Sequence, residues 1–216
     1  MSRFTGWPDE ALLFFEGLEA DNSKTYWTAH KDVYESAVRA PMLALSAELT
    51  PEFGELKIFR PYRDTRFARD KSPYKTAIGA FTGELQGVGY YVQLSATGLF
   101  VGGGCHHMTP GQVANLRTAV DDERTGTDVE CVVADLETAG YAISGEQLKT
   151  VPRGFHKEHP RARLLRHKGL TSGTDWEPAA WLHTRKTLDR IVKVWRDLAP
   201  LNDWLAKHVG PPETTR

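Results

Sequence analysis

The stretch TAIGAFTGELQGVGYYVQLSATGLFVGGG, residues 76–104, decides the fold class. It contains three runs of alternating or β-prone side chains, at residues 76–85, 90–95 and 99–101. Glycines between the runs are typical of turns. Connections this short favour hairpins, because a parallel crossover needs roughly a dozen residues or more. Together with a short strand expected at 57–60, the stretch predicts an antiparallel meander over about residues 57–103.

Helical patterns flank this meander on both sides. Pro8 and the acids after it suit the first turn of a helix, and Asn22 or Ser23 is a candidate cap for the next one. The predicted helices cover residues 8–20, 23–38, 41–49, 109–120, 127–140, 160–168, 178–198 and 204–209, with a capping box at Thr127 and Glu130 and a break at Pro200. We therefore predict a single α+β domain over residues 1–216, with a central antiparallel sheet covered by N-terminal and C-terminal helices. Residues 210–216 are expected to be a frayed tail.

The composition is that of an ordinary globular protein. Of the 216 residues, 40% are hydrophobic and 25% are charged, which excludes a mainly disordered chain. No apolar run approaches the ~18 residues of a membrane span, so we expect no membrane partner. The N-terminus lacks the pattern of a signal peptide, and Cys105 and Cys131 are too few for a disulfide framework. These features predict a cytoplasmic location.

The net charge of −1 is the sum of two basic segments and an acidic remainder of the chain. Residues 57–75, the first basic segment, hold seven Lys/Arg and two acids. Residues 149–168, the second basic segment, hold seven Lys/Arg, one acid and three histidines. The rest holds 13 Lys/Arg against 25 acids. This asymmetry indicates an anionic partner, unless each basic segment simply pairs with the acidic remainder.

The densest charged stretch is RPYRDTRFARDKSPYK, residues 60–75. Pro61 and Pro73 disfavour a regular helix, so we expect an ordered loop. Guanidinium groups offer forked donors that match phosphate or carboxylate oxygens, which predicts an anion site. The candidate ligand-binding residues are Arg60, Arg63, Asp64, Arg66, Asp70, Lys71, Tyr74 and Lys75. The alternative is an internal ion-pair lattice of the same arginines with Asp64 and Asp70, with Phe67 in the core.

The same stretch resembles the signature RxxRDxRFxxDKxPYK of a bacterial and fungal conserved domain family of unknown function. The resemblance extends to Asn22, Trp27 and Tyr34 near the N-terminus, to the strand at 89–95, and to residues 148–168. It implies that the signature residues matter to relatives, and it implies no reaction.

Other motifs give weaker indications. Cys105, His106 and His107 are metal-ligand types, but adjacent residues lack the spacing of zinc sites, so we predict no metal and no cofactor. The glycines at 102–104 lack the Lys-Ser/Thr of a P-loop.

The best interpretation is a site for a small phosphate- or carboxylate-bearing ligand, with Arg63, Arg66 and Lys71 on the anion. Asp64 or Asp70 is then a candidate acid or base, and the sequence leaves open whether the protein is an enzyme. A structural or interaction domain is the alternative. Nucleic-acid binding through the two basic segments is a third possibility, against which the overall pI of about 6.7 counts. The sequence indicates no oligomeric state.

Overall fold

The fold is built on a six-stranded antiparallel sheet with strand order β1-β2-β3-β4-β6-β5. The structure is a computed structural model that describes residues 3–64, 66, 70–83 and 87–211. The strands are β1 (Leu56–Ile58), β2 (Ala77–Thr82), β3 (Gly89–Ser95), β4 (Gly98–Cys105), β5 (Ala142–Ser144) and β6 (Leu170–Trp176). The predicted α+β class with a central antiparallel sheet is confirmed. The sheet extends beyond the predicted 57–103 meander, because β5 and β6 join it from later in the chain.

The chain divides into two units. The first unit comprises residues 1–82, 91–101 and 175–193, and the second comprises 83–90, 102–174 and 194–216. Strands β3, β4 and β6 and the long helix α7 (Lys186–His208) have residues in both units. The single domain over residues 1–216 remains a prediction.

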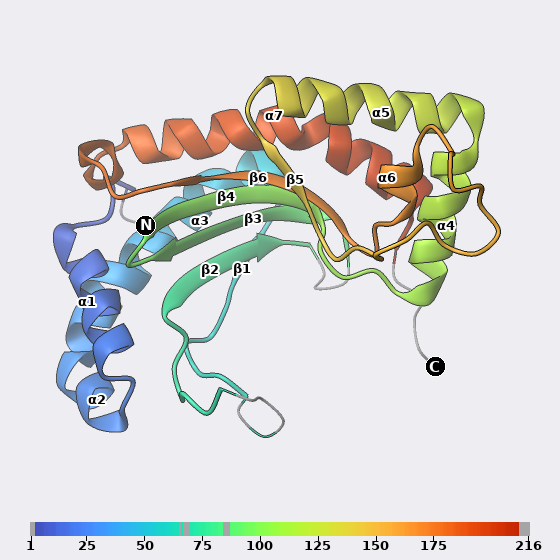
Figure 1. Cartoon of the computed structure of the whole chain (residues 1–216). Helices are drawn as coiled ribbons and strands as arrows, with labels where there is room; N and C mark the ends of the chain where they lie inside the picture. The colour runs from blue at the N-terminus through green and yellow to red at the C-terminus, as the bar shows by residue number, and fades with distance from the viewer. Residues whose placement is uncertain (1–2, 65, 67–69, 84–86, 212–216) are drawn as a thin grey trace. The chain divides into compact units, whose positions relative to one another are not determined.

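In the first unit, four helical segments follow one another before the sheet begins (Figure 1). They are α1 (Asp9–Ala20), α2 (Lys24–Val33), the π-helix η1 (Tyr34–Arg39) and α3 (Ala40–Phe53). Ser23 caps α2 by accepting a hydrogen bond from the Tyr26 N–H at 3.1 Å. Of the two predicted candidates, Asn22 and Ser23, the cap is therefore Ser23. Phe14 of α1 packs edge-on against Trp27 of α2, with 5.8 Å between ring centroids. This aromatic contact joins the first two helices.

The two faces of the β1–β3 sheet differ in burial. Ile58 is opposite Ala80, which is opposite Val92, and helix α3 contacts β1 and β2. Ala80 and Val92 are fully buried, whereas Phe81 and Tyr91 on the other face are partly exposed. Side chains alternate along a strand, so neighbouring residues lie on opposite faces of the sheet. Helix α3 covers the face of Ala80 and Val92 and does not cover the face of Phe81 and Tyr91.

In the second unit, α4 (Pro110–Asp121) and α5 (Glu123–Thr138) pack together, and α5 contacts β5. Thr109 and Gln112 form a reciprocal capping box, so the predicted start of α4 is confirmed. The predicted start of α5 at Thr127 is wrong. The carboxylate of Asp122 accepts hydrogen bonds from the N–H groups of Arg124 and Thr125, which begins this helix four residues earlier.

Two more helix predictions differ from the structure. Helix α6 covers only Ala162–Leu165, because the Arg166 carbonyl and the Lys168 N–H bond instead to the backbone of residues 148 and 146. A 3₁₀ turn, η2 (Ala180–His183), precedes α7, which then passes through Pro200 without a break. Leu198, Leu201 and Leu205 are fully buried on both sides of the proline, and this packing offsets its helix penalty. No helix in the described ranges is long and apolar enough to cross a membrane.

Gly98 begins β4 where no other residue fits. Its φ is +120°, and a Cβ placed on it would lie 2.0 Å from the carbonyl oxygen of Trp176. We predict that Gly98→Ala lowers the free energy of unfolding by more than about 1–3 kcal/mol, since backbone strain and a steric clash add together. Gly54→Ala is the matched control, because Gly54 has φ +89° but no atom within 4 Å of the place where its Cβ would lie, so only strain applies. Equal urea midpoints for the two variants would contradict this account.

Candidate functional site

The loop between β1 and β2 contains all eight predicted site residues (Figure 1). Its two arms pair: the Arg63 N–H donates to the Pro73 carbonyl at 2.9 Å, and the Lys75 N–H donates to the Pro61 carbonyl at 2.7 Å. Tyr62 and Tyr74 face each other in the same ladder. The predicted ordered loop is therefore a narrow hairpin. Thr65, Phe67, Ala68 and Arg69 lie outside the described residues, and with them the predicted burial of Phe67.

Asn22 attaches this hairpin to the helices. Its amide oxygen accepts from the Tyr74 N–H and its amide nitrogen donates to the Tyr74 carbonyl, both at 3.1 Å. The Tyr74 ring stacks on Trp27, with centroids 4.4 Å apart and an interplanar angle of 6°. Tyr74 is buried, and burial together with Tyr62 raises the pKa of its hydroxyl. The structure therefore places Tyr74 in the attachment of the loop.

Arg66 and Asp64 form a forked ion pair on the outside of the loop. The Arg66 Nε donates to Asp64 Oδ1 at 3.0 Å, and the Arg66 Nη2 donates to Asp64 Oδ2 at 2.7 Å. These side-chain bonds, with a further one from the Arg66 backbone N–H, lower the pKa of the Asp64 carboxyl. Both side chains are exposed. The fork therefore orders the loop without being buried.

Asp70 is held by Ser72 and Arg63. The Ser72 N–H and hydroxyl donate to Asp70 Oδ1 at 2.9 and 2.6 Å, and Arg63 Nη1 donates to Asp70 Oδ2. Ser72 is the main reason that the pKa of Asp70 is lowered, and the charge of Arg63 adds to it. A carboxyl with a lowered pKa stays ionised at neutral pH, so neither Asp64 nor Asp70 suits the role of a general acid.

Three cations, Arg60, Arg63 and Lys75, lie near one another where the loop joins strands β1 and β2. The Lys75 ammonium lies 5.2 Å from the centroid of the Phe59 ring. Its pKa is lowered by partial burial and by the charges of Arg60 and Arg63. Arg60 is exposed and shows no ion pair in the part of the chain that the structure describes. Lys71 is also exposed, on the arm of the loop beside Asp70.

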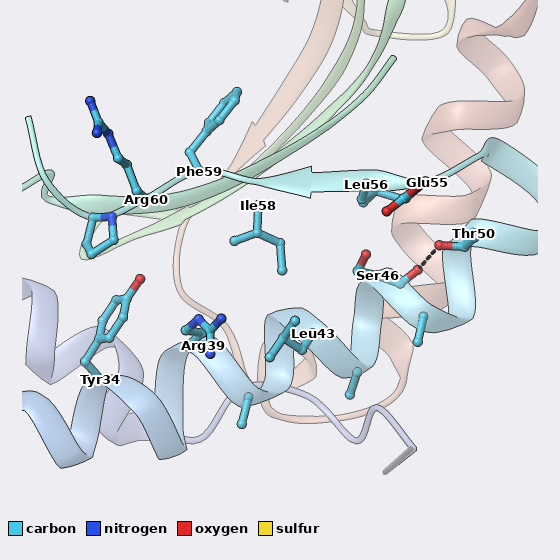
Figure 2. Close-up of a pocket in the computed structure, with 14 residues that line it drawn as sticks. Tyr34, Arg39, Leu43, Ser46, Thr50, Glu55, Leu56, Ile58, Phe59 and Arg60 are labelled. Carbon is cyan, nitrogen blue, oxygen red and sulfur yellow. Dashed lines mark hydrogen bonds between the residues drawn. The ribbon is translucent and has the colours of Figure 1, made fainter. Parts of the chain in front are cut away.

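A groove of about 1000 Å³ lies between η1, α3 and β1 (Figure 2). Figure 2 shows Ile58 pointing from β1 toward α3, whereas Phe59 and Arg60 point away from that helix. One end of the groove is lined by Tyr34, Arg39 and Arg60, and the other by Ser46, Thr50 and Glu55. Between these ends the lining is mostly small and apolar: Ala40, Leu43, Ala44 and Ala47.

The π-helix η1 places Tyr34 and Arg39 beside this groove. It directly precedes Pro41, whose ring in a regular α-helix would clash with the carbonyl four residues earlier. The wider π turn relieves that clash, and α3 follows η1 directly at Ala40, so the predicted helix end at residue 38 and new start at residue 41 are wrong. Burial raises the pKa of the Tyr34 hydroxyl to about 12, so it stays protonated. The sequence reasoning missed both groove residues, because their approach to β1 depends on this local widening.

Comparison with family models identifies the family of this chain. A family model described as a conserved hypothetical protein, DUF2461, matches residues 10–204. The chain belongs to this family. None of the curated proteins matches it. The description of DUF2461 names no reaction, so the function has to be argued from the site.

Three of the seven Lys/Arg side chains of the second basic segment of this DUF2461 chain pair with acids within the second unit. Arg163 pairs with Glu137 at 2.5 Å, Lys168 pairs with Glu146, and His159 lies 3.1 Å from Asp121. Arg161, only 5% exposed, donates to the Val120 carbonyl at 2.7 Å and also lies near Glu130. These pairs favour the interpretation that this segment compensates acidic neighbours.

The cysteine and histidine residues form no metal site in the described residues. Burial raises the pKa of the Cys105 thiol to about 11, which makes it a poor nucleophile. The glycines nearby fit close backbone contacts: a Cβ on Gly104 would lie 2.3 Å from the Leu170 carbonyl oxygen. The glycine run therefore has a packing explanation.

The carboxyl groups of the loop provide a direct test of its geometry. We predict that Ser72→Ala raises the pKa of Asp70 more than Arg63→Gln does, because it removes the hydroxyl hydrogen bond that is the largest cause of the lowered pKa, while the bond from the backbone N–H of residue 72 stays in both variants. Carboxyl ¹³C shifts in a pH titration measure this order. Since the pKa values of Asp64 and Asp70 are lowered on folding, their stabilising contribution is present at neutral pH and is lost as pH falls through those lowered values. A larger effect of Arg63→Gln on the Asp70 pKa would contradict the arrangement.

Arg161 and Arg163 make a matched pair in the second unit. Arg161→Met removes the donors to buried carbonyls at the end of α4, so we expect a loss of about 1–3 kcal/mol in the free energy of unfolding. Arg163→Met breaks only a partly exposed pair, and we expect a loss of about 0–1 kcal/mol. Urea denaturation of both variants measures the difference, and equal losses would show that Arg161 is not a structural residue.

Proposed function

We propose that the first unit binds the phosphate or carboxylate group of a small molecule at Arg60, Arg63 and Lys75. The observation that supports this most strongly is the closeness of the three cations: after partial burial, which is the larger cause, the charges of Arg60 and Arg63 lower the pKa of Lys75. Like charges held together raise the free energy of the fold, and a bound anion relieves that cost. Arg60 supplies an exposed guanidinium that presents forked donors to such a group.

The remaining signature residues act as supports in this proposal. Asp64 holds Arg66, and Ser72 and Asp70 hold Arg63, so that the loop is shaped before a ligand arrives. Arg63 keeps further N–H donors beyond the bond to Asp70. The resemblance of residues 60–75 to the family signature supports a role that relatives share. The proposal is one of binding, since the lowered pKa values of Asp64 and Asp70 keep these two carboxylates ionised.

A second candidate function is that of an interaction or structural domain whose charged loop is an ion-pair lattice. The Arg66–Asp64 fork and the Arg63–Asp70 pair favour it. Their exposure counts against a mainly stabilising role, because exposed pairs contribute little to folding. The two candidates differ in what the loss of an arginine does.

Binding of inorganic phosphate tests the first candidate. We predict that Arg60→Gln and Lys75→Gln each weaken phosphate binding about tenfold or more, the loss expected for one charge-assisted hydrogen bond. Chemical shift changes in NMR titrations at low salt measure the dissociation constants. Lys31→Gln, which removes an exposed cation of α2, is the matched control and should bind as the parent does. Absence of phosphate binding by the parent protein, or equal weakening by the control, would exclude this site.

Urea denaturation separates the second candidate. We predict that Arg66→Lys shifts the urea midpoint little, because the Arg66–Asp64 fork is exposed. A large drop in the midpoint with unchanged phosphate binding would instead support the ion-pair lattice.

A further inference from the structure

We propose that the anion bound at Arg60 and Lys75 belongs to a nucleotide whose base stacks on an aromatic row formed by Phe59, Tyr91 and Phe100. This inference rests on the proposed function and names the class of ligand. It follows from the side-chain pattern on the sheet face opposite α3.

The strand register places aromatic side chains together on that face. Phe81 is opposite Tyr91, and the Phe59 N–H bonds to the Gly79 carbonyl at 2.9 Å, so these residues share one side of the sheet. The Tyr91 ring lies 6.1 Å from the Phe59 ring and 6.0 Å from the Phe100 ring, between centroids. The row therefore crosses from the end of β1 over β3 to β4.

These rings are partly exposed, whereas most side chains on the opposite face of the same strands are buried. Ile78, Leu94 and Val101 belong to the buried face, whereas Phe59, Tyr91 and Phe100 each keep some accessible surface. Partly exposed aromatic side chains on a sheet are the platform on which single-stranded nucleotides stack. Tyr91 and Phe100 thus present partly exposed aromatic surface to a planar ligand, and the Lys75 ammonium lies over the Phe59 ring.

Gly79 lets Tyr91 lie against the sheet. The Tyr91 hydroxyl and ring carbons lie 2.5–3.0 Å from the position a Cβ on Gly79 would take. Any other residue there would displace the ring. The Tyr91 hydroxyl donates to Gln93 Oε1 at 2.7 Å, which fixes the ring orientation, and the Gln93 amide nitrogen offers donors to the edge of a base.

The positive charge joins the row at one end. The Lys75 ammonium covers the Phe59 ring, so a phosphate at Lys75 would lie directly beside the row, and a base would reach Tyr91. Arg60 leaves β1 next to Phe59, and Lys57 is opposite Phe81 on the same face. Cations at one end and stacking surface beyond them complement a molecule with a phosphate at one end and an aromatic base at the other.

The test compares three probes by calorimetry at fixed low salt: adenosine 5′-monophosphate, ribose 5-phosphate and inorganic phosphate. We expect the nucleotide to bind about tenfold tighter than ribose 5-phosphate, in line with the stacking of one base. Equal binding of these two would overturn the nucleotide inference and leave the anion site intact. Failure of all three probes to bind would overturn the proposed function as well.

Variants of the aromatic row test whether a preference for the nucleotide over ribose 5-phosphate comes from stacking on these rings. Tyr91→Leu should abolish the preference for the nucleotide and leave ribose 5-phosphate affinity within about twofold. Phe100→Leu applies the same test if Tyr91→Leu does not fold. Phe155→Leu, a partly exposed aromatic residue of the second unit, is the matched control and should keep the preference. An unchanged preference in both row variants would place the base elsewhere and overturn the inference, as would a short single-stranded oligonucleotide that binds far tighter than the nucleotide with a steep salt dependence.

Discussion

The reciprocal hydrogen bonds between Asn22 and Tyr74 are the constraint on which the charged loop depends. They join residues 52 positions apart, and they satisfy both backbone groups of Tyr74 with one side chain. With Trp27 stacked on the Tyr74 ring, the returning arm of the loop is fixed to α2. The paired arms then fix Arg63 and Lys75 relative to Arg60. The arrangement of cations is thus a consequence of one amide and one aromatic stack, and it does not rest on the ion pairs alone.

The carboxylates and the cations of this loop have different roles. Asp64 and Asp70 accept hydrogen bonds from their own neighbours, two residues along the chain, and so behave as turn-forming groups. Arg66 forms an ion pair with Asp64, whereas Arg60 and Lys75 have no carboxylate within ion-pair distance in the described part of the loop. A combination of the two interpretations therefore describes residues 60–75 better than either alone. Local pairs shape the loop, and the cations they do not neutralise are available to an anion.

Local sequence signals predicted the fold well where the decisive contacts are also local. The Ser23 cap and the start of α4 after Thr109 depend on residues within a few positions of one another, and β2 and β3 of the antiparallel meander are consecutive strands. The helix through Pro200 depends on the burial of leucines on both sides of the proline. The attachment of Tyr74 to Asn22 joins residues 52 positions apart. The eight candidate site residues are close in sequence, so the sequence predicted that they share one loop. It did not predict that Phe59 and Tyr91 lie beside them, because that depends on strand pairing in the folded sheet.

The two basic segments show why charge pattern alone does not identify a binding surface. They have nearly the same charge in the sequence, yet Arg161, Arg163 and Lys168 of the second each meet an acid or a carbonyl. The acids come from helix α5 and from residue 146, which lie within the same unit. In the first segment the only carboxylates are Asp64 and Asp70, and loop geometry directs them toward Arg66, Ser72 and Arg63. Neighbouring elements, which the charge pattern does not reveal, therefore decide which individual cations of a basic segment are paired and which of them add to a field that attracts anions.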